Sequence, residues 1–437
     1  MPRGKHVARP FLLVLALILA LGGCAGASTR APAMRTSTAV ALRTATAAAT
    51  ATTDPGAFVC ANPPGSAASY AYMAKGGRMY LVQGCHTPVA VRAPAGRQYS
   101  PIAFSPSGAW LLAWNGVANP QQPDTVSCLA LVAFSSGAVT PTTLCSPYGG
   151  GATGLARWYI PIGWASDTSF YLASARRDNV TIVSPTTVSL VSLPQLTQTA
   201  VTTLTWVATF ANGSAPSGIV LRGDALYYGG YVSQSEGGAW LHRFSLSAKT
   251  DTRIVRLGLA GSGVCQVSET PCAWTGPWDI SRDGSKIAYH NPGPTQSLSD
   301  VVTSTTETNT PLYVASSDGS GATQLFPRVT LGGFNQPSFS PDGQYIVATF
   351  SDFTSPGKVI FERLSDGAMT TAPSDLQFRG WTPQPGVALM YDDAASGAPD
   401  FIIHLELYNI VTGARTPLQP GTQGYVWTGA PQIAPQQ

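Results

Sequence analysis

Charged residues are scarce in this chain of 437 residues, because Asp, Glu, Lys and Arg together make up only 11% of it, against about 25% in typical soluble domains. The chain has 25 basic and 22 acidic residues, and three of the basic ones (Arg3, Lys5 and Arg9) lie in its first ten positions. Without these three, the two signs balance at 22 each. Nucleic-acid binding needs a basic surface, so the composition argues against a nucleic-acid partner.

Sequence motifs for common chemistry are also missing. The chain contains no GxSxG elbow, no HExxH pair, no P-loop and no GxGxxG motif that opens a helix. Neither CxxC nor a mixed Cys/His spacing occurs, and the five histidines are not spaced as metal-binding pairs. A zinc site is therefore not expected, and we predict no metal, no cofactor and no catalytic set.

Turn-forming residues, in contrast, are abundant. The chain has 45 Gly and 35 Pro residues, and Ser and Thr occur throughout. Gly, Pro and Ser favour tight turns between strands. The composition is typical of an exported, turn-rich, all-β protein.

Residues 1–24 have the layout of an export signal. A basic segment precedes the apolar run Phe11–Leu21, which is shorter than the ~20 residues that a membrane-spanning helix needs. The run closes on Leu21-Gly22-Gly23-Cys24, which resembles the lipobox of bacterial lipoproteins. The resemblance implies that Cys24 is lipidated and becomes the mature N-terminus. The alternative is an ordinary secretory signal with a chance cysteine.

Three segments follow from this signal. Residues 1–23 form the signal peptide, and residues 24–54 hold the lipidated Cys24 and an Ala/Thr-rich linker. A flexible coil of this length reaches about 30 Å on average; a helix is the weaker alternative, because Thr and Pro interrupt its period. Residues 55–437 form the folded domain. The expected location is extracytoplasmic, at the membrane, on the cell surface or in the periplasm.

The six cysteines other than Cys24 suggest three disulfides in an oxidising compartment. A hairpin centred on Ser136-Gly137 places Cys128 opposite Cys145, with Cα atoms about 4.5 Å apart if the pair is not hydrogen-bonded, which a disulfide can bridge. Pro141 in the second strand fits an edge position. Cys265 and Cys272 would close a short loop, and Cys60 then pairs with Cys85 by elimination.

An apolar or aromatic residue followed by a turn and a β run recurs along residues 65–430. The copies begin at Phe104 (FSPSG), Trp164 (WASDT), near Val220, Ile280 (ISRDG), Phe339 (FSPDG) and Trp381 (WTPQPG). Pro, Asp and Gly in this order favour a tight connection between two strands. A further pair of β runs follows each turn, so each repeat holds four strands.

The FSPDG element closely resembles the WD40-like repeat of TolB-type β-propellers, and Ser340-Pro341-Asp342-Gly343 matches it best. The resemblance implies a β-propeller of four-stranded blades and protein partners in the cell envelope. Two loose β-sandwiches are the rival fold.

The two ends of the repeat region are both incomplete. A seventh repeat start, at residues 424–428, has no chain after it to complete a blade, and residues 69–93 hold three β runs with no inner strand before them. We predict that the C-terminal strand completes the N-terminal blade and so closes a ring of seven blades. Six or eight blades are the alternatives, because the copy near Val220 is weak.

In a propeller, the segments that enter the inner strands open onto one end of the central channel. In this sequence they combine an aromatic residue with Arg, Asn or Gln. Aromatic rings beside amide and guanidinium donors suit sugars, peptides or small polar ligands. The aromatic residues are expected to pack between blades, and the binding candidates are Gln98, Arg157, Asn335, Gln336 and Arg379.

These expectations describe a binding or scaffold module at the bacterial cell envelope. It is attached to the membrane by its N-terminal lipid, and its ligand is an envelope protein, a glycan or a peptide. The alternative is a propeller hydrolase or lyase acting on a glycan or peptide in the channel. Such a site needs paired acids, or a histidine beside a base, and the predicted channel segments hold only one acid, Asp279.

The lipid anchor can be tested by Cys24→Ser. The variant lacks the thiol that carries the lipid, so we expect the protein to move from the membrane fraction to the soluble fraction after cell lysis. Immunoblotting of both fractions measures the change. Membrane retention of the Cys24→Ser protein would show that the lipobox interpretation is wrong.

Overall fold

The computed structural model describes fourteen ranges of the chain: 59–63, 66–74, 77–117, 125–148, 156–177, 185–204, 218–231, 239–257, 278–290, 312–326, 337–350, 358–392, 404–422 and 424–428. The chain divides into two compact units, 1–56 and 57–437, and all described residues belong to the second. The export signal, Cys24 and the linker lie outside the described residues.

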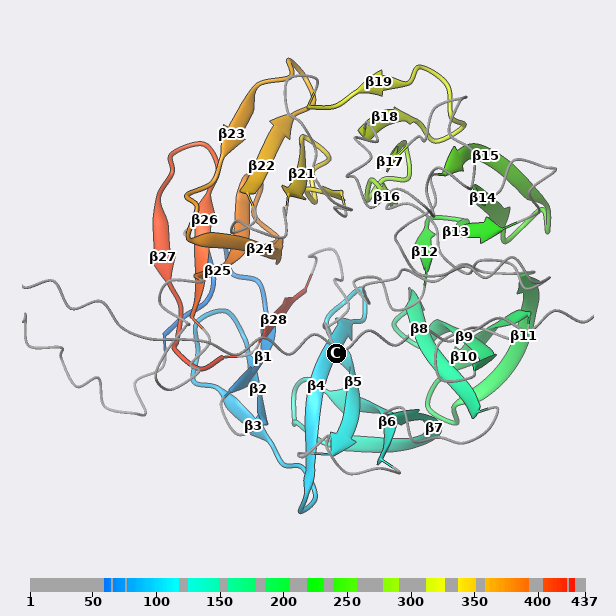
Figure 1. Cartoon of the computed structure of the whole chain (residues 1–437). Helices are drawn as coiled ribbons and strands as arrows, with labels where there is room; N and C mark the ends of the chain where they lie inside the picture. Colours follow the sequence, from blue (N-terminus) through cyan, green and yellow to red (C-terminus); the bar gives the residue numbers. More distant parts are fainter. Residues whose placement is uncertain are drawn as a thin grey trace, which may run out of the picture. The chain divides into compact units, whose positions relative to one another are not determined.

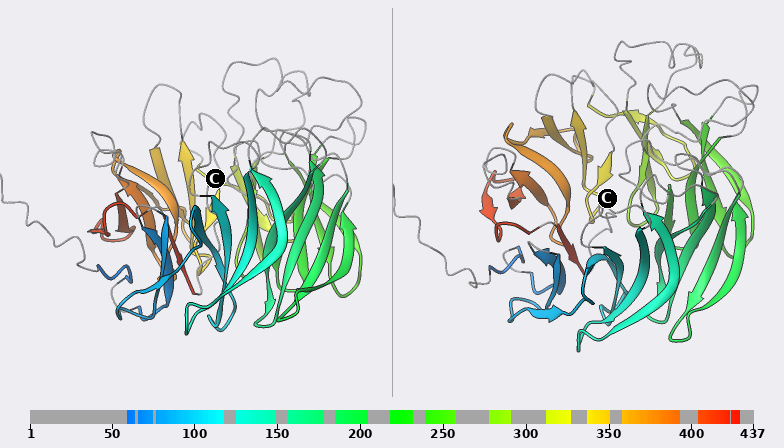
Figure 2. Two further views of the ribbon diagram at one scale, coloured as in Figure 1. Left: turned by 90° about the horizontal axis from the view of Figure 1, so that it is seen from below. Right: turned by 60° about the horizontal axis from the view of Figure 1, so that its bottom comes forward.

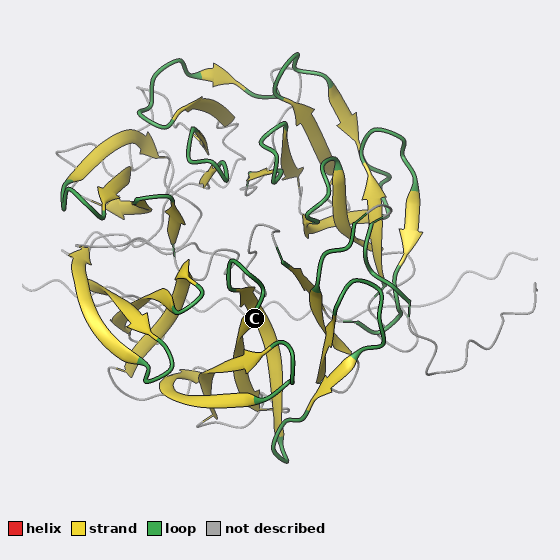
Figure 3. Ribbon diagram, turned by 180° about the vertical axis from the view of Figure 1, so that it is seen from behind, coloured by secondary structure: helices red, strands yellow, loops and turns green. Residues whose placement is uncertain are grey.

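The second unit is a ring of seven antiparallel sheets with four strands each (Figure 1). The described part of the chain contains strands and loops and no helix (Figure 3). No helix in that part is thus long and apolar enough to cross a membrane. The predicted all-β fold, a β-propeller of seven four-stranded blades, is confirmed.

We name the blades A to G in chain order. Blade A contains β28 (Gly424–Trp427), β1 (Tyr70–Ala74), β2 (Arg78–Val82) and β3 (Val89–Val91). Blade B contains β4 (Arg97–Phe104), β5 (Trp110–Val117), β6 (Thr125–Ala133) and β7 (Val139–Tyr148). Blade C contains β8 (Ala156–Ser166), β9 (Ser169–Arg177), β10 (Thr186–Ser192) and β11 (Thr197–Leu204). Blade D contains β12 (Ile219–Arg222), β13 (Ala225–Tyr231), β14 (Ala239–Ser245) and β15 (Asp251–Leu257).

The last three blades follow the same order from the inner to the outer strand. Blade E contains β16 (Trp278–Ile280), β17 (Lys286–His290), β18 (Leu312–Ser316) and β19 (Thr323–Gln324). Blade F contains β20 (Ser338–Phe339), β21 (Tyr345–Phe350), β22 (Lys358–Arg363) and β23 (Met369–Thr371). Blade G contains β24 (Leu376–Trp381), β25 (Val387–Asp392), β26 (Leu405–Asn409) and β27 (Arg415–Pro417).

The strands of each blade run back and forth between two ends of the ring (Figure 2). We call the end at which the inner strands finish the turn face, since it carries the turns of the repeat. The end at which the inner strands begin is the start face. Because neighbouring strands in a blade are antiparallel, the third strands also finish at the turn face.

The repeat turn is held by its own side chains. In blade F, the Ser340 hydroxyl accepts a hydrogen bond from the Tyr345 N–H at 2.9 Å and donates one to the Asp342 carboxylate at 2.5 Å. Gly343 has a φ of +66°, which a residue with a Cβ adopts at a cost. The SPDG motif is therefore a local turn signal, which explains why it marks the blades so well.

Strand β28 closes the ring as predicted. It pairs antiparallel with β1, with Tyr70 opposite Trp427. Just beyond the ladder, the Thr428 N–H donates to the Ser69 carbonyl at 2.8 Å, and the Ser69 N–H donates to the Thr428 hydroxyl at 3.1 Å. The C-terminal strand thus supplies the inner strand that the N-terminal blade lacks.

Apolar side chains fill all seven seams, a seam being the contact between two neighbouring blades. Each buried apolar cluster draws on two adjacent blades: A and B share one that contains Met79 and Tyr99, and G and A share one that contains Leu407 and Trp427. The aromatic residues of the described inner strands, except Trp158, belong to these clusters or pack against them; Tyr99 is 4% exposed and Trp381 2%. Their role is packing between blades, as expected.

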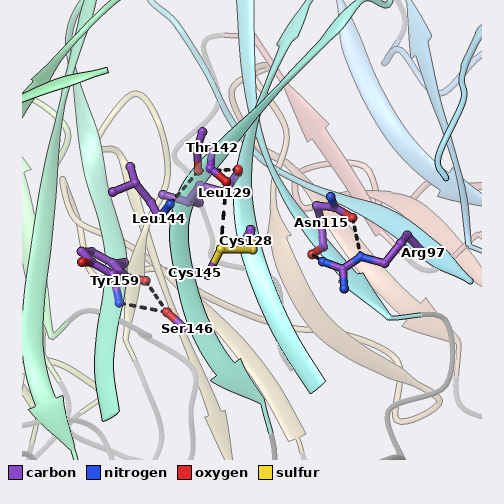
Figure 4. The surroundings of a disulfide bond; sticks show 9 residues. All are labelled: Arg97, Asn115, Cys128, Leu129, Thr142, Leu144, Cys145, Ser146 and Tyr159. Carbon is purple, nitrogen blue, oxygen red and sulfur yellow. Dashed lines mark hydrogen bonds between the residues drawn. A yellow bond between two sulfur atoms is a disulfide. The ribbon is translucent and has the colours of Figure 1, made fainter. Parts of the chain in front are cut away.

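The described part of the chain contains two disulfides, Cys60–Cys85 and Cys128–Cys145. Figure 4 shows the second of them. Both are pairs that the sequence predicts, and Cys128 and Cys145 lie opposite each other, 3.9 Å apart at Cα. The hairpin differs from the predicted one. The Ala133 N–H bonds to the Ala138 carbonyl, so the loop is four residues long, and a bulge between Cys128 and Ala130 restores the register at the cysteines. Cys265 and Cys272 lie outside the described residues.

Removal of β28 should open the ring. We expect a chain that ends at Gln423 to melt about 10 °C or more below a chain that ends at Thr428, because it loses the pairing with β1 and the burial of Tyr425 and Trp427. Differential scanning calorimetry of the two truncated chains makes the comparison. Equal melting temperatures would contradict closure by β28.

Candidate functional site

Three predicted binding residues lie within inner strands. Gln98 is in β4, Arg157 in β8 and Arg379 in β24, whereas the sequence places them in the loops that enter these strands. The inner strands extend further toward the start face than predicted, since polar and aromatic residues continue the ladder. Asn335 and Gln336 lie outside the described residues.

Gln98 packs against the neighbouring blade. A Cβ atom added to Gly77, which precedes β2 of blade A, would lie 2.3 Å from Gln98 Oε1 and 2.9 Å from Gln98 Cβ. The side chain of Gln98 therefore occupies the space that the missing side chain of Gly77 leaves at the seam between A and B. Gln98 therefore contributes to packing between blades A and B.

Arg157 is exposed near the start of β8. Tyr159, two residues further along, is fixed by the preceding blade: its N–H donates to the Ser146 hydroxyl at 2.9 Å, and that hydroxyl donates to the Tyr159 carbonyl at 3.2 Å (Figure 4). The backbone beneath Arg157 is thus held by β7 of blade B, while the guanidinium reaches solvent.

Arg379 occupies an unusual place in its strand. Register shifts in β4, β8 and β24 leave extra residues at Ile102, Ile162 and Arg379, and β8 has a second shift at Ala165. The first three occupy corresponding positions. Each of these three lies two positions before the aromatic residue that starts the repeat turn. Ile102 and Ile162 pack into seams, but Arg379 is half-buried and its Cζ lies 4.8 Å from the centre of the Tyr391 ring. A bulge changes the direction of the side chain at its extra residue. Of blades B, C and G, only blade G has a cation at this position.

Asp279, the acid that the sequence assigns to the channel segments, links blades E and F. One carboxylate oxygen accepts a hydrogen bond from the Phe339 N–H of β20 at 2.8 Å, and the other accepts one from the Ile280 N–H at 2.8 Å. Burial raises the pKa of the Asp279 carboxyl to about 6, although Arg222 and the two N–H groups favour its charged form.

Arg222, at the end of β12, makes the corresponding link between blades D and E. Its guanidinium donates to the Ile280 carbonyl at 3.2 Å and to the Ser281 carbonyl at 3.1 Å. Burial lowers the pKa of Arg222, and the charge of Asp279 partly offsets this effect. The sequence could not reveal either role, because each partner is a backbone group of the next blade.

A histidine–carboxylate pair, which sequence reasoning missed, lies in the outer half of blade D. His242 Nδ1 and the Tyr228 hydroxyl both hydrogen-bond to Asp251 Oδ2, at 3.1 and 2.7 Å, and the Tyr228 and His242 rings stack at 4.9 Å. Burial acts to raise the pKa of Asp251, but the two hydrogen bonds outweigh it and the pKa is lowered. His242 lies on β14, Asp251 on β15 and Tyr228 on β13, so the group is away from the inner strand β12.

Arg415 gathers three carboxylates in blade G. Its guanidinium bonds to Glu406 at 2.6 Å, Asp375 at 2.7 Å and Asp392 at 3.1 Å, which tie all four strands of the blade near its start face. Over the described ranges, no group of three or more His, Cys, Asp or Glu residues has the arrangement of a metal site.

Comparison with known proteins shows likeness in structure only. No family model matches the sequence, and no curated protein matches it. TolB from Acinetobacter baumannii is 12% identical, with 73% of this chain and 83% of that chain covered and a TM-score of 0.34. An oligogalacturonate lyase from Vibrio parahaemolyticus is 11% identical, with 81% and 85% covered and a TM-score of 0.44.

A structure reported for prolyl endopeptidases is 11% identical, with a TM-score of 0.50 over 82% of this chain and 50% of that chain. Likeness at such low identity concerns the fold alone. The strand order of the chain itself, seven four-stranded sheets in a ring, identifies it as a β-propeller.

Asp279 should make stability depend on pH. Its pKa is about 6 in the folded protein and about 4 in an unfolded chain, so the folded state binds the proton more tightly. Stability should therefore fall as pH rises from 4 to 6, by about 2–3 kcal/mol, and stay lower above pH 6. We expect Asp279→Asn to flatten this fall, as measured by melting temperatures across pH 4–7.

Asp224→Asn is the matched control. Asp224 is exposed, and hydrogen bonds from Ser247 lower the pKa of its carboxyl, so its contribution rises with pH instead. The control should keep the fall between pH 4 and 6. An identical profile for Asp279→Asn and the unsubstituted protein would contradict the raised pKa.

Proposed function

We propose that this protein is an extracytoplasmic binding module, held at the membrane by a lipid on Cys24 and engaging its ligand with the inner strands of the propeller. The lipobox-like segment at residues 21–24 supports the anchor. The two disulfides support an oxidising compartment.

The main support for a binding site is Arg379, the cation at the bulge of blade G. The bulge position holds isoleucine in blades B and C, where it serves packing, whereas in blade G it holds a cation, Arg379. A half-buried guanidinium stacked on Tyr391 is oriented and partly dehydrated, which strengthens its hydrogen bonds to an incoming ligand.

The chemistry of the site favours a ligand with a carboxylate or several hydroxyl groups. Guanidinium groups bind carboxylates through two parallel hydrogen bonds, and the Tyr391 ring beneath Arg379 orients its guanidinium. A glycan, a peptide or an exposed segment of an envelope protein meets these requirements. Arg157, exposed on the inner strand of blade C, offers a second guanidinium.

Cross-linking in native membranes tests the binding role. The full-length lipidated protein is cross-linked and affinity-purified in three forms: unsubstituted, Arg379→Ile and Arg243→Ile. Arg379→Ile installs the residue that blades B and C hold at the bulge. Arg243 is an exposed arginine in the middle of β14. Loss of a charged hydrogen bond weakens binding by about 10- to 100-fold, so we expect the ligand to be lost from Arg379→Ile alone.

Other outcomes bear on the proposal directly. A ligand recovered equally with all three forms would place binding away from Arg379. If no protein is recovered, thermal-shift screening of glycan and peptide fragments against the same three forms decides the ligand class. Conversion of a bound glycan or peptide to a cleaved product would favour the hydrolase or lyase alternative.

A further inference from the structure

The described chain before β1 forms a strap on the turn face of blade A. The strap consists of residues 59–63 and 66–69. Cys60 is bonded to Cys85 in the turn between β2 and β3, with the Cα atoms 5.3 Å apart. The Asn62 side-chain amide donates to the Gly84 carbonyl at 3.0 Å. The strap is therefore fixed to the same turn by a covalent bond and a hydrogen bond.

The strap also reaches the core of the closing seam. Ala61 is fully buried in the apolar cluster that blades G and A share, and its N–H donates to the Tyr70 hydroxyl at 3.0 Å. Tyr70 begins β1 and lies opposite Trp427 of β28. Any pull that travels along the backbone from the strap would thus arrive first at β1, the strand with which β28 pairs to close the ring.

The closing seam lacks a bond that two other seams have. The indole N–H of Trp164 donates to the Ala103 carbonyl of the preceding blade at 3.2 Å, and that of Trp381 donates to the Ser338 hydroxyl of the preceding blade at 3.2 Å. Trp427 holds the same repeat position in β28, but its buried Nε1 has no partner among the described residues. An unpaired buried donor weakens the seam.

We propose that the Cys60–Cys85 disulfide is a tension bypass, which passes force from the N-terminal side of the chain into the β2–β3 turn and keeps it away from β1 and β28. Residues 61–84 lie between the two bonded cysteines, so they carry no tension while the bond is intact. When a strand is pulled from one end, its hydrogen bonds break one after another. The Cys60–Cys85 bond is covalent and does not break under such a load.

The device matters because the N-terminal side is the end at which the proposed lipid holds the protein. A tethered module that binds a ligand with its inner strands is pulled between the two attachments. The inference rests on the proposed function for this biological role, but its mechanical content does not depend on lipidation.

Single-molecule force spectroscopy tests the bypass. The full-length chain carries one handle on an N-terminal peptide tag and the other on a tag inserted after Ser247, an exposed residue in the turn between β14 and β15. The unsubstituted protein should extend in no separate step before the ring ruptures. Cys60→Ala with Cys85→Ala should add an early, low-force step of about 50 Å, as residues 60–74 peel away at ~3.4 Å per residue.

The other disulfide provides the matched control. Cys128→Ala with Cys145→Ala removes one disulfide from blade B and should leave the first event unchanged. If the Cys60/Cys85 double variant does not fold, reductant added to the folded unsubstituted protein during pulling should produce the same early step.

Two results would overturn the bypass: an early step of this length in the oxidised unsubstituted protein, or no such step after loss of the Cys60–Cys85 bond. Because the handle replaces the lipid, both results are independent of the Cys24→Ser fractionation and of the Arg379→Ile capture. Failure of the bypass and failure of the proposed function are therefore distinguishable.

Discussion

Each inner strand of the ring has a strand partner on one side only, and the fold depends on how the other side is satisfied. Side chains of neighbouring blades supply the missing partners: Arg222 donates to the Ile280 and Ser281 carbonyls, and Asp279 accepts from the Phe339 N–H. Unpaired strand edges buried without water would cost free energy at every blade. The charged side chains of Arg222 and Asp279 thus have a structural role, because they pair with backbone groups of the next blade.

That constraint also separates structural from functional candidates. Asp279 has a perturbed pKa, which often marks an active site, but both of its carboxylate oxygens already bond to backbone N–H groups. Gln98 likewise fills the space over Gly77. Arg379 differs from both in its position, because blades B and C hold isoleucine at the corresponding bulge.

Local chemistry explains what could be read from the sequence. The Ser340–Gly343 turn is closed by its own hydroxyl, carboxylate and glycine, so it marks blades without any knowledge of distant contacts. The sequence predicts the Cys128–Cys145 pair correctly but predicts a two-residue loop where the structure has four residues. The pairing is still correct because a bulge in the hairpin compensates for the longer loop. Bulges leave no sequence signal of their own, so the bulge position of Arg379 could not be predicted. The partners of Arg222 and Asp279 are backbone atoms of the next blade, about 60 residues away, and no local pattern encodes them.

Both ends of the described propeller lie at its turn face. Ser69 and Thr428 bond to each other there, and the strap before Ser69 is fixed to the β2–β3 turn. Whatever holds the chain by its N-terminal side therefore holds the turn face. The inner strands begin at the opposite face, and Arg157 lies near such a beginning, while Tyr391 beneath Arg379 lies near the end of a second strand, which finishes at that same face. A single topological fact, closure by the C-terminal strand, thus separates the end of the ring at which the described chain begins from the end near which Arg157 and Tyr391 lie.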